Sequence, residues 1–204
     1  MNRVGIVALL VLGALNTGCA GRQERRPDEL WGTKLPAPLH KVDFTLLDTD
    51  GQEYRFSEET EGYVTLLFFG YTRCPDACPI HMANIAAVLK TLAPEVASQV
   101  KVVMVTVDPE RDDAAQLRIW LDNFDSAFVG LTGEIEYINE IQRMLMLGPV
   151  IKEAVGSDDY LVGHASQVVA FTRDNLAHTV YSFGTRQRDW AHDIPILIGI
   201  GRGT

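Results

Sequence analysis

Hydrophobic and polar positions alternate in two short stretches early in the chain. Residues 42–46 and 54–56 both show this period of two, and Asp50-Gly51 between them is a strong turn signal. Alternating stretches on either side of such a turn are typical of two antiparallel strands. The pattern therefore predicts an N-terminal β-hairpin.

Two later stretches are apolar almost without interruption. They run from Val64 to Phe69 and from Lys101 to Val107, and the second is rich in β-branched residues. A strand of a parallel sheet is covered on both faces, so it is apolar along its length rather than alternating. We expect these stretches to be two buried strands.

Apolar residues at helical spacing follow each of these stretches and then recur once more. Because strands and helices alternate, a parallel sheet core is expected. The predicted helical positions are Met82, Ile85, Ala86, Leu89 and Leu92; Leu117, Trp120, Leu121 and Phe124; and Ile135, Ile138, Ile141 and Leu145.

The last third of the chain predicts a hairpin and a closing helix. Residues 167–172 and 177–181 flank the turn signal Asp174-Asn175, and a helix is expected from about Arg188 to Ile198, kinked or ended at Pro195. The whole order predicts an α/β, thioredoxin-like fold with an N-terminal β-hairpin and an insertion in the middle of the domain.

The N-terminus has the pattern of an export signal. After a short positive start, Val4 to Leu15 gives about a dozen apolar residues, too few to span a bilayer comfortably. Thr17 and Gly18 then precede Cys19, as in a bacterial lipobox. We interpret residues 1–19 as a lipoprotein signal with lipidation at Cys19; an ordinary cleaved or an uncleaved signal is the alternative.

This interpretation divides the chain into three parts. Residues 20–38 are rich in Arg, Gln, Glu and Pro without apolar periodicity, and we expect a flexible tether there. Residues 39–204 are then one folded domain. The expected location is extracytoplasmic, anchored by lipid to a bacterial membrane and facing the periplasm or the cell exterior.

Composition narrows the classes of function. The 204 residues are 47% hydrophobic and 22% charged, as in an ordinary globular domain. The net charge of −9 argues against nucleic acid as a partner, because phosphate binding needs clustered Lys and Arg. Of the three cysteines, a lipidated Cys19 leaves a single pair, which in an exported protein favours redox or metal chemistry.

That pair is Cys74 and Cys78, between a predicted buried strand and a predicted helix. Open α/β sheets place their sites at this edge. Pro79 suits the first position of the helix, which leaves Cys78 beside the helix N-terminus and Cys74 in the preceding loop. The positive end of the helix dipole lowers thiol pKa values, so both cysteines are candidates for thiolates that bind a soft metal ion.

A third ligand has to come from elsewhere, and His164 is the candidate among the five histidines. It precedes the strand from Gln167, in the loop that a thioredoxin topology sets beside the cysteines; the alternative is a loop histidine without a ligand role. His81, three residues after Cys78, is a weaker candidate and is expected to face solvent. The remaining histidines are expected to have ordinary surface or core roles; these are His40, His178 and His192.

These residues resemble the Sco/SenC family of copper chaperones for cytochrome c oxidase assembly, from about Val42 to the last helix. The resemblance implies that Cys74, Cys78 and His164 bind one copper ion, Cu(I) or Cu(II), and that the two cysteines form a disulfide when oxidised. Four segments carry it: residues 68–79, 106–112, 128–133 and 160–166.

The resemblance also implies partners. The acceptor is expected to be the copper-bearing subunit of cytochrome c oxidase, at its dinuclear copper centre, or another cuproprotein, with a copper donor and a thiol reductant upstream. The family usually shows Asp, His and Ser in the last segment, whereas Gly163 and Ala165 flank the histidine here. The missing acid removes a group that orients a ligand or contacts a partner.

Two enzyme classes remain as alternatives. A thiol-disulfide oxidoreductase uses the same cysteine pair, but its usual spacing is two residues, and no proline lies between Pro149 and Pro195 to supply the cis-proline of such enzymes. A peroxiredoxin-type peroxidase needs an arginine at its cysteine, and none is identified. Two further residues have structural interpretations: Asp108 starts a turn or caps the next helix, and Trp120 is a core residue.

Overall fold

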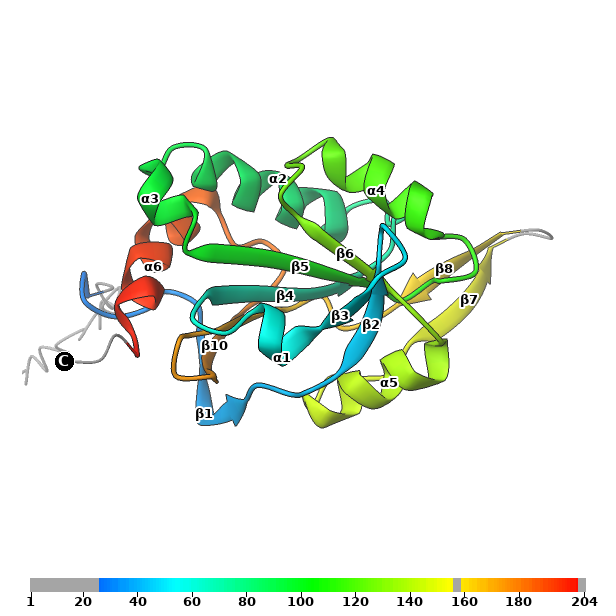
Figure 1. Cartoon of the computed structure of the whole chain (residues 1–204), viewed down its shortest axis with the longest axis horizontal. Coiled ribbons are helices and arrows are strands. Elements are labelled where there is room, and N and C mark those ends of the chain that lie inside the picture. Colours follow the sequence, from blue (N-terminus) through cyan, green and yellow to red (C-terminus); the bar gives the residue numbers. More distant parts are fainter. Residues whose placement is uncertain (1–25, 156–158, 202–204) are drawn as a thin grey trace, which may run out of the picture.

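The computed structural model describes residues 26–155 and 159–201, and its centre is one mixed β-sheet (Figure 1). Within these residues the sheet has eight strands in the order β1-β10-β9-β4-β5-β6-β2-β3. Its strands are β1 (Thr33–His40), β2 (Thr45–Asp48), β3 (Glu53–Arg55), β4 (Val64–Gly70), β5 (Val100–Thr106), β6 (Val129–Thr132), β9 (Val168–Phe171) and β10 (Leu176–Tyr181).

The two predicted apolar strands form the middle of this sheet. β4 is buried at every position and pairs parallel with β5, from Val64 opposite Val100 to Gly70 opposite Thr106. On its other side β4 pairs antiparallel with β9. The prediction of two central parallel strands is confirmed, and the carboxyl end of β4 opens into the cysteine loop.

Helices cover both faces of the sheet, with α2 and α4 on one side and α5 on the other (Figure 1). The predicted apolar positions of these three helices face the core; Met82, Leu117 and Ile138 are fully buried. Gly130 lets α4 approach β6, because a Cβ there would lie 2.8 Å from Leu117. The helices are α1 (Phe56–Glu59), α2 (Ala77–Leu89), α3 (Pro94–Ala97), α4 (Ala114–Asp122), α5 (Ile135–Met144) and α6 (Gln187–Gly199).

Both predicted hairpins of the sheet are confirmed. β2 and β3 pair around Gly51, whose positive φ of 74° fits the turn, and β9 and β10 pair around Asn175, with a φ of 60°. The helix does not end at Pro195, which was one of the two expected outcomes, since α6 continues through it to Gly199. The buried side chains on either side, such as Ile194 and Leu197, hold the helix together although Pro195 lacks one backbone donor.

The boundary between tether and domain lies earlier than predicted. Residues 33–40 form β1, which pairs antiparallel with β10 at the edge of the sheet. The two prolines of β1 argue against a strand in the sequence, because proline cannot donate a backbone hydrogen bond. It is tolerated here because β1 is an edge strand. The first 25 residues, with the predicted signal and Cys19, lie outside the described residues.

A buried carboxylate fixes the segment just before β1 to the body. Asp193 of α6 accepts hydrogen bonds from the backbone N–H groups of Trp31 (2.8 Å) and Gly32 (2.9 Å) and from the hydroxyl of Tyr181 (2.8 Å). The Trp31 ring also stacks on His192, with 3.8 Å between ring centroids. The part of the predicted tether from Trp31 onward is therefore structured.

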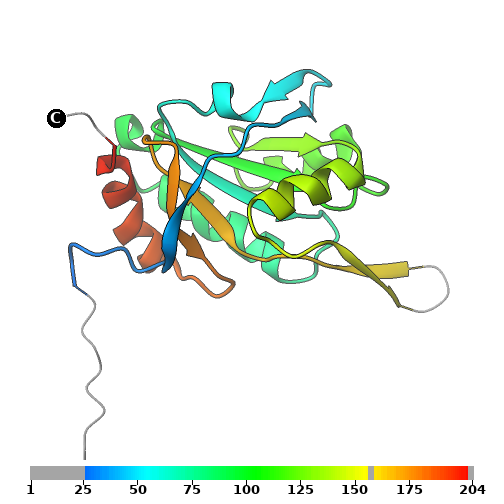
Figure 2. The ribbon, with the colours of Figure 1, turned by 90° about the horizontal axis from the view of Figure 1, so that it is seen from below.

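The predicted mid-domain insertion contains a separate two-stranded sheet. β7 (Ile151–Val155) and β8 (Asp159–Gly163) pair antiparallel and extend away from the body (Figure 2). All five residues of β7 are exposed, so the strand lacks the one-sided burial that gives a detectable pattern. Among the described residues, no helix has the length and apolar character needed to cross a bilayer.

Candidate metal centre

The cysteine loop is a tight turn between β4 and α2. The backbone N–H of Cys74 donates to the Tyr71 carbonyl at 3.2 Å. Asp76 is the N-cap of α2, and its side chain accepts from the N–H of Ala77 at 2.6 Å. Pro79 is thus the third helical residue, not the first as predicted; the first-turn N–H groups have no intrahelical partner, so proline is tolerated there as well.

The two sulfurs lie against each other at the start of α2. Cys78 is fully buried and Cys74 is half-buried, and both are free thiols. The backbone N–H of Cys78 donates to the Sγ of Cys74 at 3.4 Å. The loop and the helix N-terminus therefore hold both sulfurs at one end of the central strand, as predicted.

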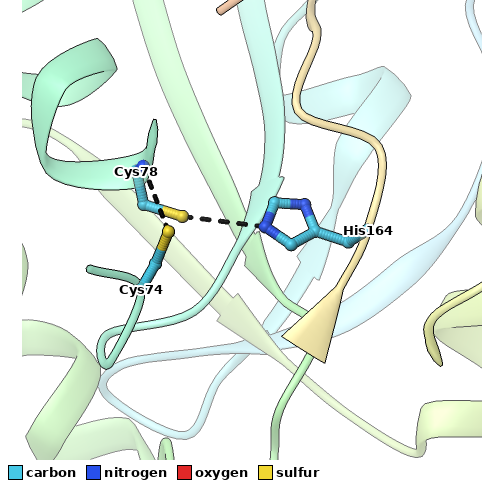
Figure 3. A group of neighbouring side chains, drawn as sticks. All are labelled: Cys74, Cys78 and His164. Atoms are coloured by element: carbon cyan, nitrogen blue, oxygen red, sulfur yellow. Dashed lines mark hydrogen bonds between the residues drawn. The ribbon is translucent and has the colours of Figure 1, made fainter. Parts of the chain in front are cut away.

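The structure brings His164 to the same place from the end of β8. Its Nε2 lies 3.8 Å from the Sγ of Cys78, and its Nδ1 lies 2.9 Å from the carbonyl oxygen of Ala165 (Figure 3). A carbonyl only accepts, so Nδ1 carries the proton and the lone pair of Nε2 faces the sulfurs. The ligand atoms of Cys74, Cys78 and His164 all lie within 4.8 Å of one another.

The two thiols differ sharply in acidity. The pKa of Cys74 is lowered to about 4, chiefly by the hydrogen bond from Cys78, against the opposing effect of burial. The pKa of Cys78 is raised, by that same hydrogen bond and by burial. The apo pair therefore holds one thiolate and one proton, and a metal ion that binds both sulfurs has to displace that proton.

Asp112 anchors the cysteine loop to the neighbouring strand β5. Its buried carboxylate accepts from the backbone N–H (2.8 Å) and the hydroxyl (2.5 Å) of Thr72 and from the hydroxyl of Thr106 (2.8 Å). Each donor is a buried group that needs an acceptor in the interior. Asp112 thus joins the loop after β4 to the end of β5.

The same turn reaches β8 through Asp108 and Arg111. The Arg111 guanidinium contacts Asp108 at 2.5 Å and Asp159 at 2.7 Å and lies over the Tyr160 ring, 3.6 Å from its centroid. The Tyr160 hydroxyl donates to Asp108 at 2.7 Å. These contacts hold the beginning of β8, the strand that leads to His164.

Asp108 fulfils one of the two predicted roles. Its carbonyl accepts from the N–H groups of Arg111 and Asp112, which is the expected turn. It does not cap the next helix; Asp113 caps α4 by accepting from the N–H of Gln116. The side-chain contacts of Asp108, Arg111 and Asp112 were missed by sequence reasoning, although the segment 106–112 had been singled out by the resemblance.

Aromatic rings surround His164. The Tyr71 ring meets it edge-on with 5.8 Å between centroids, and the Phe68 ring does so at 6.1 Å. The hydroxyl of Tyr71 also accepts from the N–H of Val162 in β8, at 3.4 Å. Tyr71 therefore joins the cysteine loop to the histidine strand directly.

His81 differs from its prediction. It is only 1% exposed, not solvent-facing, because Phe68 of β4 and Phe183 after β10 cover the first turns of α2. Trp120 agrees with its prediction, since it packs against the core and against Phe124. Among the described histidines, His40, His178 and His192 are outside the three-residue group; His178 contacts Asp174, and His192 contacts Asp193.

The strand-loop-helix unit with two cysteines at the end of the central strand defines a thioredoxin-like domain. A sequence profile of the SCO1/SenC family matches residues 33–199. With this match over most of its length, the chain belongs to the SCO1/SenC family.

Individual relatives agree with this assignment. The chain is similar to the mitochondrial SCO2 homolog of Bos taurus, 32% identical over 163 residues, which are 79% of this chain and 59% of that protein. A SCO2-like protein of Rickettsia prowazekii is 30% identical over 170 residues, 80% of this chain and 77% of that protein. The chain thus spans less than two thirds of the length of its bovine relative.

Among solved structures, the copper-bound ScoI of Bradyrhizobium japonicum superposes with a TM-score of 0.69. The identity is 28%, and the match covers 78% of this chain and 99% of that one. The predictions of the family and of the thioredoxin-like fold are confirmed by these comparisons.

Proposed function

We propose that this protein binds one copper ion through Cys74, Cys78 and His164 and delivers it to another protein. The observation that carries the proposal is the convergence of two sulfurs and one imidazole nitrogen within 4.8 Å. Soft sulfur ligands with an imidazole suit copper, whereas hard cations prefer oxygen. The copper-bound state of the ScoI relative supports the choice of metal.

The acceptor in this proposal is the dinuclear copper centre of cytochrome c oxidase. Cu(I) or Cu(II) is the cargo rather than a resident cofactor, and it leaves by exchanging its three ligands for those of the acceptor. The protein works from a lipid anchor at Cys19, on the periplasmic or outer side of a bacterial membrane. A copper donor and a thiol reductant prepare it for loading.

Anaerobic titration of the reduced full-length protein with copper tests the ligand set. We expect one tightly held copper ion per chain. In His164→Ala we expect the affinity to fall by about 100-fold or more, since groups that merely orient ligands contribute about 10- to 100-fold. The Cu(II)-thiolate absorption should also change in this variant.

His40→Ala is the matched control, because His40 lies outside the three-residue group. It should bind copper like the wild type. Unchanged affinity and spectra in His164→Ala would remove His164 from the site.

A second function, thiol-disulfide exchange, is favoured by the unequal acidity of the two cysteines. The Cys74 thiolate, with its pKa of about 4, is suited to attack a partner disulfide, and Cys78 is placed to resolve the mixed disulfide. Two electrons and the Cys78 proton then pass to the partner, which takes its second proton from water, while Cys74 and Cys78 form a disulfide. Rapid reduction of a disulfide substrate without metal, together with weak copper binding, would favour this function.

A further inference from the structure

His81 is a poorly paired buried imidazole, one helical turn beyond Cys78. It is 1% exposed, and neither Nδ1 nor Nε2 makes a hydrogen bond of good geometry, although the backbone of Ser166 is near enough to affect its pKa. Buried polar atoms are nearly always paired, and an unpaired one destabilises the folded protein. A leucine or phenylalanine at this position would avoid that cost, so we expect a function that requires the ring nitrogens of His81.

Its position in α2 points toward the metal centre. Cys78 and His81 are the second and fifth residues of the helix, and residues three apart lie on the same helix face with Cβ atoms about 5–6 Å from each other. Cys74, Cys78 and His81 thus come from one stretch of eight residues. A thiolate and an imidazole one turn apart are donors suited to the same soft ion.

Both imidazoles contact the same aromatic ring. The Phe68 centroid is 5.4 Å from that of His81 and 6.1 Å from that of His164. His81 also meets Phe183, whose ring centroid is 6.2 Å away and whose side chain is 48% exposed. Because Phe183 is half-exposed, we expect it to move aside when the His81 ring turns.

His81 also has the right protonation state for a ligand. Burial lowers its pKa, although the backbone at Ser166 and the charge of Cys74 act in the opposite direction. The ring is therefore neutral, and a neutral imidazole offers a lone pair to a metal ion.

We propose that His81 is a reserve copper ligand, which replaces His164 when β8 moves away from the cysteines. This inference rests on the proposed function. In the structure His81 is outside the three-residue group, so the exchange requires its side chain to rotate toward Cys78.

The exchange balances without any other reactant. One bond from copper to the His164 nitrogen breaks, and one bond from copper to a His81 nitrogen forms, while both sulfur bonds persist. No electron is transferred, and no proton leaves, since each imidazole binds copper through a nitrogen lone pair. Copper thereby keeps three ligands while His164 and its loop are free to engage the acceptor.

The test uses reduced full-length protein, anaerobic Cu(I) and nitrogen-detected NMR of the histidine rings. In His164→Ala we expect one copper ion per chain, at reduced affinity, and a shift of a His81 ring nitrogen on copper addition. His81→Phe keeps an aromatic ring against Phe68, so it should fold and, with His164 present, bind copper within a few-fold of the wild type. The double variant His81→Phe/His164→Ala should bind at least about 10-fold more weakly than His164→Ala alone.

The pair His40→Ala/His164→Ala is the matched control and should bind like His164→Ala. An unshifted His81 ring nitrogen in copper-loaded His164→Ala, or equal affinities of His164→Ala and the His81 double variant, would overturn the reserve role while copper binding by the wild type stands. A wild type that binds no copper would instead overturn the proposed function and this inference with it.

Discussion

The two halves of the candidate metal centre are held by the protein in different ways. The cysteines lie between a strand and a helix of the core, where β4 is buried at every position and Cys78 is fully buried. The histidine follows β8, which belongs to a separate two-stranded sheet extending from the body. Hydrophobic packing fixes the first half, and a few polar and aromatic contacts fix the second.

This difference suits the proposed delivery of copper. Exchange requires one ligand to leave first, and elements with few buried contacts open at the lowest free energy. We expect the His164 side to open while the cysteines remain in place.

The largest effect should be the difference in reactivity between the two thiols. The pKa of Cys74 is lowered to about 4, so its alkylation by iodoacetamide should be nearly constant from neutral pH down to about 5, halve near pH 4, and fall about tenfold per pH unit only below that. Buried Cys78, with its raised pKa, should stay unlabelled. Mass spectrometry of each site against pH measures both.

Linkage gives the sign of the effect on stability. The Cys74 pKa is lower in the folded protein than its usual 9.0, so its thiolate stabilises the fold above that value, and this contribution declines as the pH falls through 9 and is lost at about 4. In Cys78→Ala, the side-chain hydrogen bond that contributes most to the low pKa of Cys74 is removed, so the midpoint of Cys74 labelling should rise. Equal labelling of both cysteines, or a Cys74 midpoint near 9, would contradict the assignment.

Asp112→Ala should destabilise the protein more than Tyr160→Phe or Gly163→Asp does. It leaves the buried N–H and hydroxyl of Thr72 and the hydroxyl of Thr106 without their acceptor. We expect a loss of about 3 kcal/mol, which for a domain of this size lowers the melting temperature by about 10 °C. Thermal unfolding of the apo protein measures it.

The matched control for this substitution is Asp122→Ala. Its half-exposed carboxylate makes a surface ion pair with Arg118 at 2.8 Å, worth about 0.3–0.5 kcal/mol. A similar effect of the two substitutions would show that Asp112 does not anchor the loop.

Tyr160→Phe should have a smaller effect that is confined to the histidine half. It removes the hydrogen bond from the Tyr160 hydroxyl to Asp108 but leaves a ring under Arg111. We expect a loss of about 1 kcal/mol and faster amide hydrogen exchange in β7 and β8, with α2 unchanged. Faster exchange spread equally over α2 and β8 would mean that the two halves are not independently held.

The smallest change in stability is expected for Gly163→Asp, which restores the acid that the family usually has there. Gly163 is exposed, and an added Cβ would meet the Ile151 carbonyl oxygen at 3.5 Å, an ordinary contact. The free energy of unfolding should change by less than about 0.5 kcal/mol. A change in copper affinity without a change in melting temperature would show that the residue before His164 influences how tightly copper is bound.

The sequence predicts the cysteine half much better than the histidine half, for a physical reason. An apolar strand, a loop with two cysteines and an amphipathic helix are consecutive, so local patterns predict where Cys74 and Cys78 lie. The contacts that hold β8 join distant residues, such as Tyr160 and Asp108, 52 positions apart. Hydrophobic periodicity does not predict contacts between such distant residues. β7 is exposed at every position, so its sequence has no periodicity either.

Two other differences have the same origin. His81 was expected to face solvent because the early helix position says nothing of Phe183, which reaches it from beyond β10. Residues 33–38 of β1 fall in the predicted tether because the partner strand β10 is about 140 residues away and the segment contains two prolines. Burial supplied by distant segments is invisible in a local pattern.

The attachment of Trp31 and Gly32 to Asp193 also has a mechanical consequence. Force applied to the chain ahead of Trp31 would be taken up first by these hydrogen bonds to α6 and then by β1, at the edge of the sheet. Two strands, β10 and β9, separate that edge from β4, which carries the cysteine loop. We therefore expect force on the residues before Trp31 to move the domain as a whole, without changing the distance between the two sulfurs.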